Sequence, residues 1–155
     1  MRKTRIFIYS ILVCLLYNET IFSIEQPNKL GISIGNLWLG AKGNIFSQII
    51  STEVRYYGFD PEVKTLSART HCNFYRSRKV NTFVGLEYGQ IYFNMEGISG
   101  DGSLIMPFIG TELLIIHRIS LSIDIGYANI TLKSKGFSVS GPEWLCNIGV
   151  IFYFL

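Results

Sequence analysis

Residues 119–130 read ISLSIDIGYANI, a stretch in which apolar residues alternate with small or polar ones. One set of alternate positions is apolar and consists of Ile119, Leu121, Ile123, Ile125 and Tyr127. The positions between them are small or polar and consist of Ser120, Ser122, Asp124, Gly126 and Ala128. Successive side chains of a β-strand point to opposite faces of the sheet. The stretch therefore predicts a strand with one apolar face.

The same alternation recurs along the chain, and no window shows a convincing helical period. It is clear in five further segments, which are residues 51–57, 65–75, 82–93, 105–116 and 144–154. A less regular run begins at Leu30 and loses the pattern at Leu37, Trp38 and Leu39, which suggests a bulge or a strand end. The sequence therefore predicts an all-β protein.

Segments rich in glycine, proline and polar residues separate these strands, and they are of two lengths. Tight turns are predicted near residues 117–118 and around residues 77–79. Longer loops are predicted for residues 94–103 and 133–143, which are rich in glycine. Short turns at one rim and long loops at the other are typical of an up-and-down antiparallel meander.

The composition of the less apolar face indicates where that face points. A soluble sheet covers its water face with lysine, glutamate, threonine and glutamine, whereas this face is rich in glycine, serine and alanine. Acidic and basic residues lie among these small residues: Glu53, Arg55, Arg69, His71, Glu87, Glu112 and Asp124. Small residues suit a crowded interior, and opposite charges can pair across a narrow lumen. The pattern predicts a protein with its apolar face outward and a structural charge network inside.

The composition agrees with a membrane-spanning barrel. Of 155 residues, 48% are hydrophobic, 14% aromatic and 16% charged, against about 25% charged in an average soluble domain. Outward isoleucine, leucine, valine and phenylalanine would contact lipid, and aromatic residues would form girdles at the two interfaces. The girdle candidates are Trp38, Tyr56, Tyr57, Tyr88, Tyr92, Tyr127 and Trp144.

The number of strands follows from the topology of such barrels. A single-chain bacterial barrel has an even number of strands, and about eight leave a lumen that side chains can fill. Because the alternation gives seven segments, one strand is missing. Either residues 30–57 divide differently, or residues 131–143, in which Phe137 and Val139 alternate, add a short strand. We expect eight strands.

The first residues have the layout of a secretory signal peptide. Arg2, Lys3 and Arg5 precede an apolar run at residues 6–17, which is shorter than the roughly 20 residues that span a membrane as a helix. We predict a signal peptide at residues 1–23, with cleavage near Ser23, and one barrel domain at residues 24–155. Removal of the signal leaves a nearly neutral chain, so no electrostatic feature points to nucleic acid.

The mature chain resembles the small bacterial outer-membrane β-barrels, the group that includes the OmpA transmembrane domain and OmpX. The most specific segment is the carboxy-terminal WLCNIGVIFYFL, in which alternate apolar residues run to a terminal aromatic. In this group such a segment is the signal that the barrel assembly machinery recognises. The resemblance assigns that role to Trp144, Ile148, Val150, Phe152 and Phe154. One departure is that Phe154 is penultimate.

The resemblance implies an integral outer-membrane barrel that contacts outer-membrane lipid and the assembly machinery and serves a structural or adhesion-like role. We expect no enzymatic activity, no cofactor and no metal, and the sequence names no loop ligand. An alternative is an exported soluble barrel, similar to a lipocalin, whose apolar faces enclose an apolar ligand. A third interpretation is a membrane-embedded lipid-modifying enzyme that uses His117 and Ser120. Because His117 lies in a predicted turn, the sequence gives this interpretation little support.

Overall fold

The structure is a computed structural model, and it describes residues 30–46, 49–58, 61–77, 79–95 and 97–154. The predicted signal peptide lies outside the described residues. Within them, no helix is long and apolar enough to cross a membrane. All regular structure in this part of the chain is β-strand.

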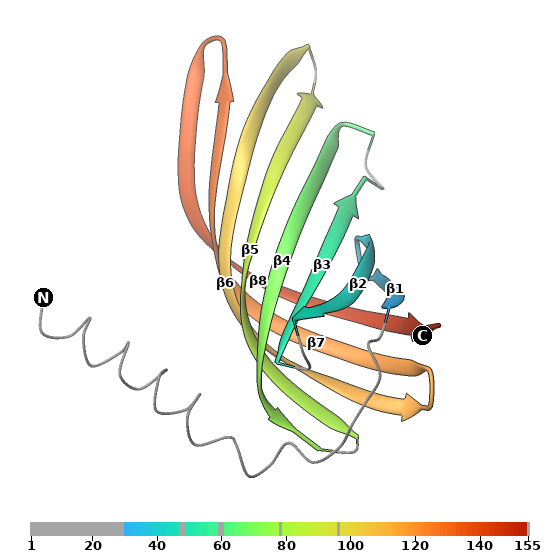
Figure 1. The fold of residues 1–155 in the computed structure, drawn as a ribbon. Coiled ribbons are helices and arrows are strands. Elements are labelled where there is room, and N and C mark those ends of the chain that lie inside the picture. The colour runs from blue at the N-terminus through green and yellow to red at the C-terminus, as the bar shows by residue number, and fades with distance from the viewer. Residues whose placement is uncertain (1–29, 47–48, 59–60, 78, 96, 155) are drawn as a thin grey trace, which may run out of the picture.

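Eight antiparallel strands close into a barrel (Figure 1). Each strand pairs with its neighbours in the chain, and the first strand pairs with the last. The strands are β1 (Leu30–Gly35), β2 (Leu39–Phe46), β3 (Ile50–Tyr57), β4 (Val63–Arg76), β5 (Val80–Met95), β6 (Ile98–Ile116), β7 (Ile119–Ser134) and β8 (Phe137–Tyr153). The prediction of an all-β, eight-stranded up-and-down barrel is confirmed.

The missing strand comes from the segment before Tyr57. What the sequence suggested to be one irregular run is two strands, β1 and β2, joined by a tight turn in which the Gly35 N–H donates to the Trp38 carbonyl at 2.8 Å. The loss of alternation at Leu37 therefore marks a strand end. The other explanation, a short separate strand at residues 131–143, is wrong because these residues belong to β7, a turn and β8.

The two predicted long loops are also wrong. Residues 94–103 lie mostly in β5 and β6, which pair as far as Met95 and Ile98, and residues 133–143 lie mostly in β7 and β8. Gly100 and Gly102 serve close packing within strands, whereas a Cβ at Gly136 or Gly141 would meet nothing within 4 Å. A Cβ at Gly100, for example, would collide with the Lys133 carbonyl and the Phe93 ring. Among the residues that the structure describes, only Gly97, at φ 84°, needs the freedom of a turn glycine.

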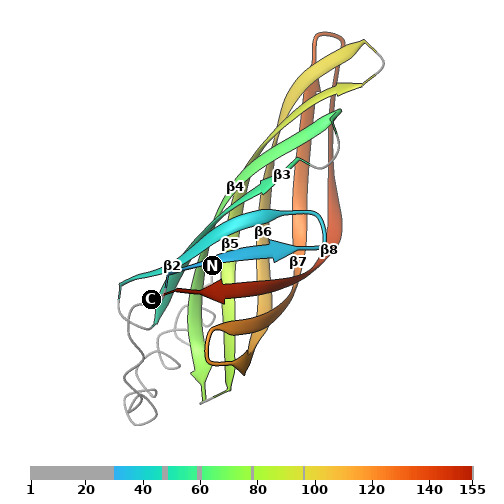
Figure 2. The same cartoon turned by 90° about the vertical axis from the view of Figure 1, so that its right-hand side faces the viewer.

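Strand lengths differ greatly around the barrel. β1 has 6 residues, whereas β6 has 19 and β8 has 17. Figures 1 and 2 show the hairpins β5–β6 and β7–β8 rising well beyond the β1–β2 turn. The upper rim is therefore strongly slanted. The opposite rim carries the short turns and both ends of the described chain, where the Phe154 N–H donates to the Leu30 carbonyl at 2.9 Å.

The predicted alternation matches the burial of the side chains. Along β7, Ser120, Ser122 and Asp124 are buried, while Ile123 and Ile125 are exposed. Small residues on the inner face let neighbouring strands and large side chains approach. At Gly85, an added Cβ would collide with the Phe108 ring and with the Thr70 carbonyl.

We expect Gly85→Ala to destabilise the folded barrel by about 1–3 kcal/mol, because the new methyl group must displace the Phe108 ring or the β4 backbone. Gly141→Ala is the matched control, since nothing lies within 4 Å of a Cβ at that position. The free energy of unfolding of both variants can be measured by urea titration in detergent. Equal stability of the two variants would contradict the tight inner packing.

Candidate functional site

The middle of the lumen holds a network of buried ion pairs centred on Arg69. Its guanidinium donates to both carboxylate oxygens of Asp124, from Nη2 to Oδ1 at 2.8 Å and from Nη1 to Oδ2 at 3.0 Å. Its Nε lies 3.1 Å from Oε2 of Glu87. These groups come from β4, β7 and β5, and all three side chains are almost completely buried. Arg69 thus connects strands on different sides of the barrel.

A second arginine, Arg55, completes the network from β3. Its Nη2 lies 3.0 Å from Oε2 of Glu53 and 3.7 Å from Oδ2 of Asp124. The same Glu53 accepts from the Ser33 hydroxyl at 2.6 Å, and its Oε2 lies 3.5 Å from Nε2 of His71. Glu53 therefore joins β1 to the strands that carry the two arginines.

Neutral donors add further hydrogen bonds to these carboxylates. Glu87 Oε1 accepts from the hydroxyls of Ser67 at 2.6 Å and Tyr57 at 3.1 Å. Asp124 Oδ1 accepts from the Asn147 amide at 2.8 Å. Buried charges need such partners, because each carboxylate has lost the water that would otherwise solvate it.

Aromatic rings pack against both guanidinium groups. The Cζ of Arg55 lies 3.5 Å from the centre of the Trp38 ring, and the Cζ of Arg69 lies 3.7 Å from that of Phe108. Such stacking fills the lumen and favours the cations. Two girdle predictions are therefore wrong. Trp38 is 1% exposed because the β1–β2 turn folds its ring inward over Arg55, and Tyr57 points inward as a donor to Glu87.

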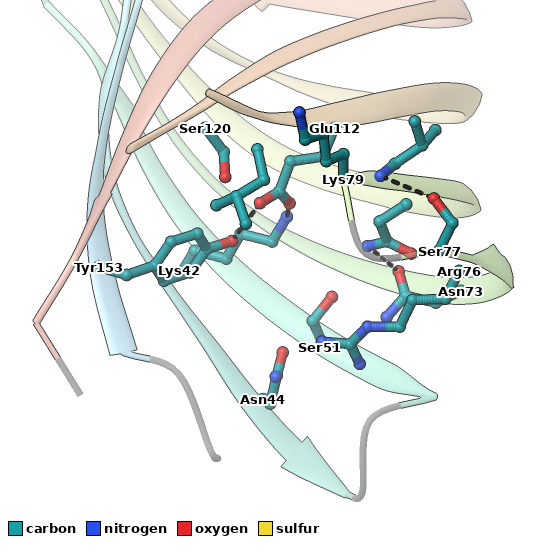
Figure 3. A pocket seen from close by; sticks show the side chains of 13 residues that line it. Lys42, Asn44, Ser51, Asn73, Arg76, Ser77, Lys79, Glu112, Ser120 and Tyr153 are labelled. Atoms are coloured by element: carbon teal, nitrogen blue, oxygen red, sulfur yellow. Dashed lines mark hydrogen bonds and ion pairs between the residues drawn. The ribbon is translucent and has the colours of Figure 1, made fainter. Parts of the chain in front are cut away.

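Near the lower rim a separate ion pair lies in a polar cavity (Figure 3). Lys42 Nζ donates to Glu112 Oε2 at 2.7 Å, and the Tyr153 hydroxyl donates to Glu112 Oε1 at 2.7 Å. The cavity is lined by polar side chains from several strands, among them Asn44, Ser51, Asn73, Arg76 and Ser120. The contacts of Glu112 join β2, β6 and β8.

The structure places all seven residues of the predicted charge network inside the lumen. Glu53, Arg55, Arg69, His71, Glu87 and Asp124 share the central cluster, and Glu112 lies apart with Lys42. Sequence reasoning missed Lys42, Ser33 and Tyr57 as members. Lys42 was missed because the strand that carries it was not recognised, although Gly40, Lys42 and Asn44 alternate with Leu39 and Ala41.

The outer surface carries a belt of exposed apolar side chains. Leu86 is 53%, Ile109 49%, Ile125 47% and Ile148 49% exposed. At the upper side of this belt Tyr88, Tyr127 and Trp144 point outward, and the Tyr127 and Trp144 rings lie 5.1 Å apart. Charges inside and a continuous apolar surface outside are the reverse of a soluble barrel. The lipocalin-like alternative is therefore wrong.

The carboxy-terminal residues with a predicted assembly role lie on this outer surface. Trp144, Ile148, Phe152 and Phe154 are exposed and Val150 is partly exposed, all with alternate orientation along β8 and just beyond it. Their role as an assembly signal stays a prediction.

The residues of the proposed catalytic alternative lie in different surroundings. His117 is exposed in the β6–β7 turn, whereas the Ser120 side chain is buried inside the barrel. Among the described residues, no group of three or more histidine, cysteine, aspartate or glutamate side chains is arranged to hold a metal ion. Cys72 and Cys146 are free thiols.

Comparison with known proteins gives structural likeness without sequence likeness. No protein-family model and no curated protein sequence matches the chain. The crystal structure of Neisserial surface protein A is similar, with a TM-score of 0.53, 14% identity, and coverage of 82% of this chain and 93% of that one. CarO of Acinetobacter baumannii gives a TM-score of 0.36 with 11% identity, covering 83% of this chain and 98% of that one. OmpT of Vibrio cholerae gives 0.36 with 18% identity, and the match covers 76% of this chain and 41% of that one.

The likeness to the neisserial protein shows the fold, an up-and-down barrel of the small outer-membrane type. With the apolar belt, this fold makes the chain an integral membrane barrel of the kind that bacterial outer membranes contain. The resemblance stated from the sequence is confirmed at the level of the fold.

We expect Arg69→Met to destabilise the folded barrel by about 3–5 kcal/mol, because it leaves Asp124 and Glu87 buried without their main cation. Arg118→Met, in an exposed turn, is the control and should change the free energy of unfolding by no more than about 0.5 kcal/mol. Chemical unfolding in detergent micelles measures both. Stability of Arg69→Met equal to that of the control would rule out a structural role for the network.

Proposed function

We propose that the protein is a non-enzymatic integral barrel of the bacterial outer membrane that presents its tall hairpins above the bilayer for binding. The observation that carries this proposal is the opposite character of the two faces. Large apolar side chains are exposed around the barrel, and charged side chains are buried within it. Lipid is the solvent in which such a surface is stable, because it removes the apolar area from water.

The filled lumen argues against a general porin. Arg55, Arg69 and their carboxylate partners cross the middle of the barrel, and the Trp38 and Phe108 rings pack against them. Barrels of about eight strands are just wide enough for side chains to fill, and no aqueous channel is then left. The network serves as a structural plug.

The tall hairpins support a binding role at the cell surface. Bacterial barrels place short turns on the periplasmic side and the segments that extend furthest from the membrane, here the tall hairpins, on the outside. By this rule the rim that carries Leu30 and Phe154 faces the periplasm, and the β5–β6 and β7–β8 hairpins project outward. Outward side chains near their tips are polar, including Asn94, Asp101 and Lys133.

The proposed partners are those that a barrel needs in order to insert into the outer membrane and to remain there. Outer-membrane lipid contacts the belt, and the assembly machinery reads the outward residues of β8 during insertion. The binding partner of the hairpins is not specified by any motif. Without the predicted signal peptide the chain is nearly neutral, which gives no reason to expect nucleic acid.

We expect the expressed protein to sediment with the outer membrane and to change its gel mobility on boiling, because a closed barrel resists mild detergent until it is heated. Fractionation followed by gels of boiled and unboiled samples measures both properties. A soluble periplasmic protein with unchanged mobility would contradict the proposal.

We expect Ile123→Lys to destabilise the inserted barrel by about 2–4 kcal/mol, since it puts a cation in the middle of the lipid-facing belt. Thr131→Lys lies on the same outer face of β7, above the belt, and should cost about 0–1 kcal/mol. Unfolding titrations in lipid vesicles compare the two variants. If both variants were equally stable, the position of the belt would be wrong.

A further inference from the structure

The two faces of the long strands exchange their character above the aromatic girdle. Below Tyr88 on β5, the inner residue Glu87 is 0% exposed and the outer residue Leu86 is apolar. Above it, the inner residues Ile91 and Phe93 are apolar, and the outer residue Gln90 is exposed and polar. The strand keeps its period of two, but its polar face has moved from inside to outside.

The other tall strands show the same exchange. On β6 the inner Leu104 is 6% exposed, while Asp101 and Ser103 point outward. On β7 the inner Ile130 and Leu132 alternate with outward Thr131 and Lys133. We call residues 89–95, 98–104 and 129–143 the tall wall. Apart from Tyr92 and Pro142, its outward residues are polar. Its outer face suits water, so this wall stands above the hydrocarbon with its apolar face turned inward.

The inner face of the tall wall borders a cavity of about 480 Å³. Its lining is almost entirely apolar and includes Ile91, Phe93, Leu104, Leu132 and Leu145. Tyr57 and Asn147, which belong to the charge network, also line it, so the cavity lies next to the plug. The volume falls within the range of about 300–1,000 Å³ that is typical of small-molecule sites.

The wall on the other side of this cavity from the tall wall is formed by the β1–β2 hairpin, and it is low. The pairing of β8 with β1 ends at Gly149 and Gly35, and the last backbone contact is from the Asn36 N–H to the Ile148 carbonyl at 3.0 Å. Above that point β8 has no strand partner on this side among the described residues. Figure 2 shows the β1–β2 hairpin ending far below the tips of the tall wall.

The low wall connects the cavity with the lipid-facing belt. Leu37, in the β1–β2 turn, lines the cavity and is also 63% exposed. Its neighbours Ile34 and Leu39 point outward in the belt. An apolar path therefore runs from the membrane surface over this turn to the inner face of the tall wall.

We propose that the cavity binds an acyl chain of an outer-leaflet lipid, which enters over the β1–β2 turn while its headgroup stays at the rim. The apolar lining matches a hydrocarbon chain, and the path over Leu37 supplies it from the bilayer. This inference rests on the proposed membrane location. It gives the barrel a lipid-binding site that is distinct from its general contact with the bilayer.

A peptide strand fits the cavity less well than a lipid does. A strand added to the free edge of β8 would need a continuous row of backbone donors and acceptors. Pro142 lies in that edge segment and has no N–H, and proline is one of the residues by which proteins block edge pairing. Leu30, the first described residue, lies at the opposite rim.

The test is photolabelling of the purified full chain in nanodiscs of phosphatidylethanolamine that include a phosphatidylethanolamine with a diazirine in its acyl chain. Labelled positions are mapped by mass spectrometry. We expect labels on the belt, at residues such as Ile123, and on the inner face of the tall wall, at Leu104 and Leu132. Leu132→Asp should reduce the inner labels about tenfold, since it places an unpaired carboxylate against the chain.

Thr131→Asp, one residue away on the outer face, is the matched control and should leave the inner labels unchanged. Both variants are first checked for the mobility shift of a folded barrel. Belt labels without inner labels would overturn the acyl-chain site and leave the proposed membrane location intact. Absence of belt labels would overturn the membrane location itself. Particles that hold two chains and lack inner labels would show that a second copy covers the cavity, which also overturns the inference.

Discussion

The bidentate pair between Arg69 and Asp124 is the interaction on which the rest of the barrel depends. A slip of one residue in β4 would turn the Arg69 guanidinium toward lipid and leave the buried Asp124 and Glu87 carboxylates without their main cation. The network therefore helps to fix the register of β3, β4, β5 and β7 relative to one another. It also explains the small inner residues, because Ser67 and Gly85 leave space for long side chains that reach across the lumen. The eight strands form the wall, and the ion pairs fix how that wall is aligned.

Each long strand passes from lipid surroundings into aqueous surroundings along its length. In the membrane the backbone bonds are all satisfied within the closed sheet, so the outer side chains must be apolar and the polar ones turn inward. Above the Tyr88 and Trp144 girdle the surroundings are aqueous, and the usual order of a soluble sheet returns. The alternation of side chains continues without interruption from the membrane part of each strand to the aqueous part. The change of surroundings alters only which of the two sets of alternate residues is apolar. This explains how one hairpin can contribute both to an ion-filled lumen and to an apolar cavity.

The class of fold was predictable from alternation and from the small size of the inner residues, because both follow from strand geometry and lipid contact. The individual errors have physical causes. Trp38 looked like an interfacial residue, but the turn that carries it folds inward and its ring stacks on Arg55. Gly100 and Gly102 looked like loop residues, yet they sit where neighbouring backbones approach too closely for a Cβ. Lys42 went unseen because its strand is short and rich in glycine. The partners of particular polar groups, such as the Tyr153 hydroxyl that donates to Glu112, depend on distances between strands that alternation does not encode.

The seam between β1 and β8 makes the barrel an indivisible unit. It joins residues from the two ends of the described chain, such as Gly31 and Tyr153, through only five paired positions. Contacts between such distant residues form late, because the whole intervening chain must first be ordered. A repeat protein can lose an end unit and keep the rest, since each unit contacts only its neighbours. Here, loss of either terminal strand would open two edges in hydrocarbon at once, and every unpaired backbone group along them would lack a partner. The shortest strand of the barrel is therefore as indispensable to its closure as the longest.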